Sequence, residues 1–335
     1  MTYTVAVVGA TGAVGEQMLE ILERRDYPVE RLIPLASARS TGKTVTFRGR
    51  AYPVQELTAQ SFAGVDLALF SAGASVSRDF APAAAAAGAW VVDNTSYFRM
   101  QEDIPLVVPE VNPGHLAGAT RRIIANPNCS TIQMVVALAP IQRAAGLKRV
   151  VVSTYQAVSG AGRRAMEELE EQARAFAAGT PTPTPEAFPH PILFECLPHI
   201  GAFLESGDTV EEVKMVEETR KIFDLPNLPV TATTVRVPVL VGHSEAVNVE
   251  TEDPLSAAQA RTLLANQPGV TLLDDPARGR YPLARAAAGT DPVYVGRVRQ
   301  DTSVPHGLNM WIVADNLRKG AALNAVQIAE LLLDA

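Results

Sequence analysis

The sequence predicts an α/β protein with a doubly wound parallel sheet, followed by a second, α+β domain. Two observations indicate this fold class. Strands and helices alternate from the N-terminus to about residue 127, and a glycine-rich turn directly follows the first strand. Beyond that point, long β-rich runs and helical stretches follow one another without an internal repeat. The chain has 335 residues, which is enough for two such domains.

Composition narrows the class of protein. Lys and Arg number 29 and Asp and Glu 36, a formal charge of −7, so neither a nucleic-acid partner nor a membrane partner is expected. Hydrophobic residues make up 47% and charged residues 19%, as in folded globular proteins. The two cysteines cannot form a disulfide framework, and no HxxxH or CxxC spacing supports a metal site. Residues 1–5 carry no basic secretory signal, so a cytoplasmic location is expected.

The first domain is expected to alternate strands and helices. Residues 5–8 form a short β-rich run, after which Met18, Ile21 and Leu22 recur at helical spacing. The other elements expected here are strands at 31–36, 65–70 and 89–92 and a helix at 77–88. This alternation is typical of βαβ units and therefore of a parallel sheet.

The second domain is expected to mix strands and helices. The expected strands lie at 148–158, 231–241, 245–250, 293–300 and 308–313, and the expected helices at 165–178, 210–223 and 256–266. A terminal helix is expected at 319–333. Ser256 is a candidate N-cap. Residues 180–185 read TPTPTP, which excludes a helix or a central strand and predicts an exposed loop. We expect residues 1–127 plus 313–335 to form the first domain and residues 128–312 the second, because the terminal helix can pack back on the first domain.

Gly9, Gly12 and Gly15 form a GxxGxxG pattern between the first strand and the first helix. Glycines permit a tight turn and a close backbone approach, and the helix N-terminus supplies unpaired N–H groups and the positive end of its dipole. The pattern is therefore interpreted as the pyrophosphate-binding turn of a Rossmann-type domain. The alternative is a plain glycine-rich turn.

The end of the second strand carries no carboxylate. NAD enzymes commonly place an acidic residue there to bind the ribose 2′-hydroxyl. Residues 37–43 instead read SARSTGK, in which Arg39 and its neighbouring hydroxyls suit a 2′-phosphate. The sequence thus favours NADP, with a solvated basic loop as the alternative.

Cys129 follows Asn126, Pro127 and Asn128 and precedes an apolar helical stretch. In the first turn of a helix, the dipole and the unpaired N–H groups favour a thiolate and stabilise an oxyanion on a bound acyl group. A buried inert cysteine is the alternative, and the polar residues just before it argue against that alternative. Cys196 has no such context.

His243 lies in VGHSE, at 241–245, which we interpret as a turn between two strands. A histidine that titrates near neutral pH is the natural proton acceptor for a cysteine, although spacing alone does not establish the pair. The other four histidines stand in loops beside Pro or Gly, where a structural role is equally compatible: His115, His190, His199 and His306.

Ten segments, in order and over essentially the whole chain, resemble the aspartate-β-semialdehyde dehydrogenase family. They include GATGAVG at 9–15, NPNCSTIQM at 126–134, STYQAVSGAG at 153–162, EEVKMVEETRKI at 211–222 and RVPVLVGHSEAV at 236–247. The resemblance implies a second domain like the C-terminal domain of glyceraldehyde-3-phosphate dehydrogenase, serving catalysis and dimerisation. It also implies a homodimer or a homotetramer.

The resemblance further implies an activity. This is the NADP-dependent, reversible conversion of L-4-aspartyl phosphate to L-aspartate-4-semialdehyde and inorganic phosphate. The reaction belongs to the biosynthesis of lysine, threonine, methionine, isoleucine and diaminopimelate. A cysteine thiolate would displace the phosphate, hydride would reduce the thioester, and a histidine would shuttle the proton as the thiohemiacetal collapses.

The family's functional residues fall on matching positions of this chain. The implied catalytic residues are the nucleophile Cys129, the acid/base His243 and the substrate-orienting Gln156. The implied substrate and phosphate ligands are Arg99 and Lys214 for the phosphate, Arg236 for the α-carboxylate, Glu211 for the α-amino group, and Asn128. The implied cofactor contacts are Gly9, Thr11, Gly12, Ala13, Val14, Arg39, Ser40, Ser71, Ser159, Gly160 and Asn316. Residues 180–191 match no motif of the family.

Three alternatives remain at this point. N-acetyl-γ-glutamyl-phosphate reductase has the same chemistry, but its acetylated substrate nitrogen needs no carboxylate such as Glu211. A catalytically silent NADP-binding relative would lack Cys129 or His243, and both are present. A redox-sensing Cys129 would need a resolving thiol, for which Cys196 is the only candidate.

Overall fold

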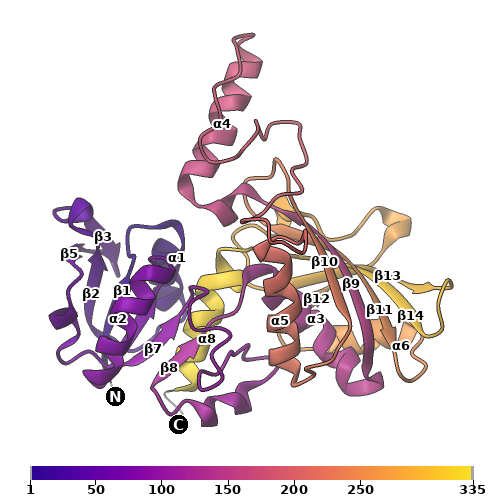
Figure 1. Cartoon of the computed structure of the whole chain (residues 1–335), viewed down its shortest axis with the longest axis horizontal. Coiled ribbons are helices and arrows are strands. Elements are labelled where there is room, and N and C mark those ends of the chain that lie inside the picture. Colours follow the sequence, from indigo (N-terminus) through magenta and orange to yellow (C-terminus); the bar gives the residue numbers. More distant parts are fainter. Residues whose placement is uncertain (1, 333–335) are drawn as a thin grey trace. The chain divides into compact units, whose positions relative to one another are not determined.

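The computed structural model describes residues 2–332, which form two compact units (Figure 1). The described residues up to Asn128 and from Ala321 onwards form the first unit, and Cys129–Gly320 form the second. The sequence placed the return to the first domain at 313, whereas the residues up to Gly320 group with the second unit. Among the described residues, no helix combines the length and hydropathy that crossing a membrane would need.

The first unit contains a six-stranded sheet in which every pair of neighbours is parallel. Its order is β5 (Gln55–Glu56), β2 (Val29–Ala36), β1 (Tyr3–Val8), β6 (Leu67–Phe70), β7 (Trp90–Asp93) and β8 (Ile123–Ala125). The four strands expected in the first domain are all present, so the doubly wound parallel sheet is confirmed. The last four residues of β1 are fully buried, as in a strand covered on both faces.

Three α-helices belong to this first unit: α1 (Ala13–Arg24), α2 (Ala74–Ala86) and α8 (Leu323–Leu331). Met18, Ile21 and Leu22 of α1 share one buried cluster with Val326 and Ala329 of α8, because helical spacing places them on one face of each helix. A small antiparallel pair, β3 (Thr44–Phe47) and β4 (Arg50–Pro53), follows β2.

The terminal helix begins later than the sequence indicated. A π-helical turn occupies Arg318–Ala322, and the α-helix starts only at Leu323 instead of Lys319. The unit boundary falls inside this turn. Leu333, the last residue of the expected helix, lies outside the described residues.

The second unit contains a mixed six-stranded sheet. Its order is β10 (Val230–Arg236), β9 (Leu147–Gln156), β11 (His243–Thr251), β14 (Gly307–Ala314), β13 (Val293–Asp301) and β12 (Val270–Leu272). The two outer pairs are parallel and the three inner pairs antiparallel. This is the α+β arrangement that the sequence predicts for the second domain.

Helices pack on one face of this sheet. They are α3 (Cys129–Ala145), α5 (Val210–Phe223) and α6 (Ala257–Ala265). Thr209 and Ser256 cap α5 and α6 through reciprocal capping boxes, so the predicted N-cap at Ser256 is confirmed. A single turn, α7 (Ala284–Ala287), lies near β14.

One helix of the second unit leaves the sheet. In Figure 1, α4 (Arg163–Ala177) projects away from the strands of its own unit. The segment 180–185 after it contains neither helix nor strand and is largely exposed, as predicted for the TPTPTP run. At the C-terminal end of α4, the exposed ring of Phe176 packs edge to face against the exposed ring of Phe194, with centroids 4.8 Å apart.

Two local expectations at the start of β11 were wrong. β10 ends at Arg236 instead of continuing to Val241, because Pro238 cannot donate a ladder hydrogen bond. The chain then turns at Gly242, whose φ is +99°. His243 is therefore the first residue of β11 and not part of the turn itself.

Candidate active site

The glycine-rich turn of the first unit is packed too tightly for side chains. Gly9 has a φ of +89°, and a Cβ there would lie 2.6 Å from the carbonyl oxygen of Ser71. A Cβ on Gly15 would lie 2.2 Å from the carbonyl oxygen of Gly9. Gly12 is the N-cap of α1 and offers no side-chain acceptor, so the first N–H groups of the helix stay available to an anion.

The basic loop after β2 lies beside this turn. The hydroxyl oxygens of Thr11 and Ser40 are 3.5 Å apart, although they are 29 residues apart in the chain. Arg39 is exposed on the short 3₁₀ turn Ala38–Ser40. The turn suits a pyrophosphate and the loop suits a further phosphate, so the residues present fit NADP.

Arg99 of the first unit is buried and held by backbone carbonyls. Its Nε donates to the Asn126 oxygen at 2.9 Å and its Nη2 to the Asn94 oxygen at 3.0 Å. The Asn126 side chain donates to Asn94 Oδ1 and accepts from Asn324 Nδ2, both at 2.7 Å. The Asn-Pro-Asn segment is therefore a buried anchor for Arg99, and Asn128 within it is also buried.

Cys129 is the first residue of α3 and is half-buried, so the predicted position in the first helical turn is confirmed. The end of the second unit passes directly over it. A Cβ on Gly320 would lie 2.8 Å from the Cβ of Cys129. Any larger residue at position 320 would collide with the side chain of Cys129, so this position requires glycine.

His243 is fully buried and its ring is oriented by the backbone. The Ala157 N–H donates to Nδ1 at 3.0 Å, so a neutral ring carries its proton on Nε2. Nε2 has no hydrogen-bond partner within the described chain. Burial and, secondarily, the charge of Arg236 lower the pKa of His243 to about 3, against a smaller opposing effect of Glu211. His243 is thus neutral at physiological pH.

Arg236 and His243 face the same space. A Cβ on Gly160 would lie 2.8 Å from Arg236 Nη1 and 3.1 Å from His243 Nε2, so the glycine keeps that space open. Arg236 Nη1 donates to the Ala157 oxygen at 2.6 Å. Burial lowers the pKa of Arg236, while the charges of Cys129 and Glu211 oppose that change.

Glu211 links two of the other expected site residues. Its Oε1 accepts from Gln156 Nε2 and its Oε2 from Lys214 Nζ, each at 3.1 Å. Glu211 and Lys214 are three residues apart on α5, which places them on one face of the helix. The carboxylate is buried and the ammonium partly exposed, so this pair is more than a solvated surface ion pair.

Asn316 is buried, and its side chain bridges two loops of the second unit. Its Oδ1 accepts from the Gly242 N–H at 2.9 Å, and its Nδ2 donates to Ser159 Oγ at 2.9 Å. These bonds tie the turn before His243 to the 157–160 segment. Asn316 therefore supports the position of His243 and Gly160.

Sequence reasoning missed several supporting residues. Asn126 is hidden inside a motif that pointed only to the cysteine, and the Ala157 amide has no side-chain signal. Glu245 and Gln133, both fully buried, were also missed. Glu245 carried a signal: a carboxylate two residues after His243 faces the same side of a strand.

Comparison with known proteins identifies the family of the chain. Residues 4–119 match the family described as "Semialdehyde dehydrogenase, NAD binding domain", and residues 138–319 match "Semialdehyde dehydrogenase, dimerisation domain".

The chain is similar to curated relatives over its whole length. It is 55% identical over 335 residues to the aspartate-semialdehyde dehydrogenase of Aquifex aeolicus, covering 99% of this chain and 98% of that protein. It is 56% identical over 330 residues to that of Legionella pneumophila, covering 98% and 95%. The Vibrio cholerae aspartate semialdehyde dehydrogenase II, crystallised in complex with ASA, superposes with a TM-score of 0.97 at 51% identity, covering 100% of this chain and 99% of that one. The chain belongs to the aspartate-semialdehyde dehydrogenase family.

Proposed function

We propose that this enzyme reduces L-4-aspartyl phosphate to L-aspartate-4-semialdehyde with NADPH, reversibly and through a thioester on Cys129. The observation that carries the proposal is the charged cluster of the second unit, in which Glu211 joins Gln156 to Lys214 and acts electrostatically on Arg236. Such a cluster suits a substrate that bears an ammonium group, a carboxylate and a phosphate. The reaction serves the biosynthesis of lysine, threonine, methionine, isoleucine and diaminopimelate.

Substrate binding uses complementary charges. Arg236 binds the α-carboxylate with its planar fork, which a lysine cannot offer. Glu211 attracts the α-ammonium group, and Gln156 holds the Glu211 carboxylate in place by donating a hydrogen bond to it. Lys214 and Arg99 bind the phosphate, and the carbonyls of Asn94 and Asn126 orient the Arg99 guanidinium for that role.

In the first chemical step, the Cys129 thiolate attacks the acyl carbon and the phosphate leaves with the electron pair of the C–O bond. The N-terminus of α3 favours the thiolate. Negative charge develops on the carbonyl oxygen, and the Nε2–H of His243 donates to it from the space above Gly160.

The second step reduces the thioester. When bound, NADPH supplies the hydride, and Gly9, Gly12 and Gly15 together with Thr11, Ala13, Val14, Arg39, Ser40 and Ser71 would hold it, with Ser159, Gly160 and Asn316 near its reactive end. His243 Nε2–H donates again to the oxyanion on the acyl group. Collapse of this oxyanion breaks the C–S bond, which releases the aldehyde and regenerates the Cys129 thiolate.

The decisive test is a substrate comparison. The purified chain is assayed for NADPH formation with L-aspartate-4-semialdehyde, NADP and inorganic phosphate, and in parallel with N-acetyl-glutamate semialdehyde. Turnover is expected only with the aspartate compound and only when phosphate is present. Preference for the acetylated compound would overturn the substrate assignment, and turnover without phosphate would overturn the acyl-phosphate chemistry.

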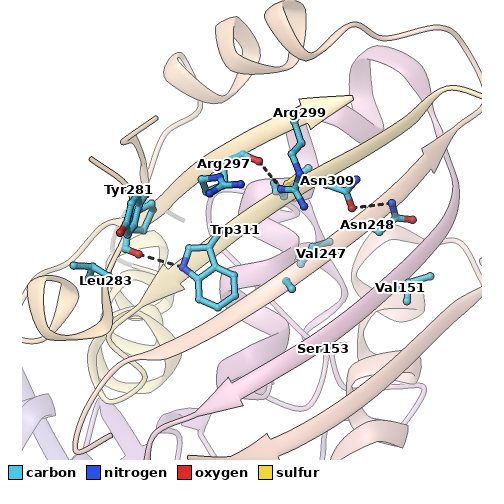
Figure 2. A pocket seen from close by; sticks show the side chains of 13 residues that line it. Val151, Ser153, Val247, Asn248, Tyr281, Leu283, Arg297, Arg299, Asn309 and Trp311 are labelled. Atoms are coloured by element: carbon cyan, nitrogen blue, oxygen red, sulfur yellow. Dashed lines mark hydrogen bonds between the residues drawn. The ribbon is translucent and has the colours of Figure 1, made fainter. Parts of the chain in front are cut away.

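We also propose that two copies associate through the sheet face opposite α3. Figure 2 shows this face, where Trp311, Arg297 and Arg299 line a hollow of about 510 Å³ together with Tyr281 and Leu283. An apolar, aromatic face with arginines is typical of an interface core. The match of residues 138–319 to a dimerisation domain supports this choice. A homotetramer built from such dimers remains compatible with it.

The association is tested by sedimentation. Ser153→Arg places a charge in the hollow and is expected to shift the protein from dimer to monomer. Ala258→Arg, on an exposed position of α6, is the control and should leave the dimer intact. Unchanged dimers in Ser153→Arg would exclude this face.

We place the enzyme in the cytoplasm. Both cysteines are free thiols, and the proposed nucleophile works only in reduced form, which a reducing compartment maintains. Fractionation of cells that produce the protein is expected to recover it with cytoplasmic markers.

A further inference from the structure

Glu245 is a buried carboxyl group that the proposed reaction does not use. It lies on β11 two residues after His243, so its side chain points to the same face of the sheet, towards α3. The residue is fully buried, and within the described chain neither carboxyl oxygen has a hydrogen-bond partner of standard geometry. A group buried in this way costs stability unless something compensates for it.

The neighbours of Glu245 carry no charge that would stabilise a carboxylate. Across the strands it lies opposite Thr154 of β9 and Ile312 of β14, both neutral and fully buried. From α3 the side-chain amide of Gln133 interacts with it as a hydrogen-bond donor and lowers its pKa, but burial is the larger effect and raises the pKa well above its ordinary value. Burial without a facing cation therefore favours the neutral acid form of Glu245.

Gln133 connects the two elements that carry the reacting groups. It lies one helical turn after Cys129 on α3, and its Nε2 donates to the backbone oxygen of His243 at 3.4 Å. Its Oε1 is buried and, in the part of the chain described, has no partner. An acidic O–H beside this oxygen would complete a chain from Glu245 through Gln133 to the His243 backbone.

We propose that Glu245 is a positioning residue, which donates its carboxyl proton to Gln133 Oε1 and thereby fixes the helix of Cys129 against the strand of His243. A single carboxyl proton then gives a hydrogen-bond partner to both the Glu245 carboxyl group and the Gln133 Oε1 atom. A charged carboxylate would have no proton to give to Gln133 Oε1, and that buried oxygen would stay without a donor. The chemical role of this geometry rests on the proposed function, whereas the hydrogen-bonded chain itself does not.

The test compares two substitutions of similar volume. Glu245→Gln keeps a donor for Gln133 Oε1, and Glu245→Leu removes it. Glu245→Gln is expected to retain kcat within about threefold, whereas Glu245→Leu lowers kcat by about 10- to 100-fold with little change in KM, because reacting groups held out of place lose rate more than affinity. Glu250→Gln, on the same strand and paired with Lys148, is the matched control and should resemble the unmodified enzyme.

Two readouts need no substrate. The rate of Cys129 alkylation by iodoacetamide is expected to follow the order of the kcat values. The infrared difference spectrum between the unmodified protein and Glu245→Gln should show the carbonyl band of a protonated carboxylic acid. NADP affinity should be equal in all variants, which excludes global misfolding.

Equal kcat values for Glu245→Gln and Glu245→Leu would overturn the proposal, as would a carboxylate band in place of the acid band. If the unmodified enzyme lacked semialdehyde activity while the acid band and the alkylation order were observed, the proposed function would fail and the hydrogen-bonded chain would stand.

Discussion

The two units of this enzyme build their parts of the proposed site in different ways. In the first unit, the turn at 9–15 is proposed to bind through backbone N–H groups, and a Cβ at Gly9 or Gly15 would clash with the backbone around it. In the second unit, the proposed site uses side chains from four separate elements, those of Cys129, His243, Arg236 and Glu211, whose charges affect one another. The first part of the site therefore depends on the conformation of the backbone. The second part depends on the chemical groups of single side chains.

This contrast predicts that substitutions in the second unit reduce turnover and those in the first unit reduce cofactor affinity. The largest effect is expected for Cys129→Ala. Activity should fall by roughly 10⁴-fold or more, because no other thiol forms the thioester. NADP binding, followed by fluorescence, should be nearly unchanged, and Cys196→Ala is the matched control with normal turnover. Retained turnover in Cys129→Ala would contradict the nucleophile assignment.

The next effect tests whether His243 acts through its Nε2 atom, by comparing His243→Asn with His243→Gln. The Oδ1 of asparagine can take the place of the ring Nδ1 and accept from the Ala157 N–H, whereas the amide of glutamine reaches the place of Nε2. His243→Asn should lower kcat by about 10²- to 10³-fold, as for a lost oxyanion donor, and His243→Gln should lose less. Steady-state kinetics of both variants decide this. If both lost activity equally, His243 would act by accepting and releasing a proton, as the sequence alone suggested.

In the first unit, Gly15→Ala forces the turn apart, because the added Cβ would meet the Gly9 oxygen at 2.2 Å. Overpacking of this kind costs about 1–3 kcal/mol, so NADP affinity should fall by about 10- to 100-fold. Calorimetry of NADP binding measures it. Gly114→Ala, where a Cβ meets nothing within 4 Å, is the control. A Gly15→Ala variant with normal affinity would show that the turn does not bind the pyrophosphate.

An effect of similar size, but confined to the phosphorylated cofactor, is expected for Arg39→Ala. A lost charge-assisted contact to the 2′-phosphate is worth about 1.5–3 kcal/mol, so NADPH affinity should fall by about 10- to 100-fold while NADH affinity stays nearly constant. Lys43→Ala, in the same exposed loop, is expected to change both affinities only slightly. Equal losses for the two cofactors would refute the role of Arg39.

The effect that is smallest at neutral pH is on the free energy of unfolding, which is expected to depend on pH. The folded-state pKa of His243 is about 3 and its ordinary value is 6.5, so only the unfolded chain binds a proton between these values. This contribution is fully present above pH 6.5 and is lost as the pH falls towards 3, by at most about 1.4 kcal/mol per pH unit. Urea unfolding of the unmodified enzyme and of His243→Gln should show a shallower dependence for the variant. Parallel curves would contradict a buried neutral ring.

The same contrast explains what could be predicted from the sequence. The Gly9–Gly15 turn is local, so the pattern and its neighbouring strand and helix were sufficient, and Cys129 was found because its helix start is also a local signal. The bridges made by Asn316, Asn126 and the Ala157 amide join segments far apart in the chain, and no spacing reveals them. The π-helical turn at 318–322 was missed because a helical pattern does not show which residues keep i→i+4 bonds.

The account's central claim is the thioester on Cys129, and mass spectrometry tests it most directly. The enzyme is mixed with L-4-aspartyl phosphate without NADPH, quenched in acid and digested. One aspartyl group on the Cys129 peptide and one inorganic phosphate released per active subunit are the predicted result. No adduct, or an adduct on any other residue, would contradict the account.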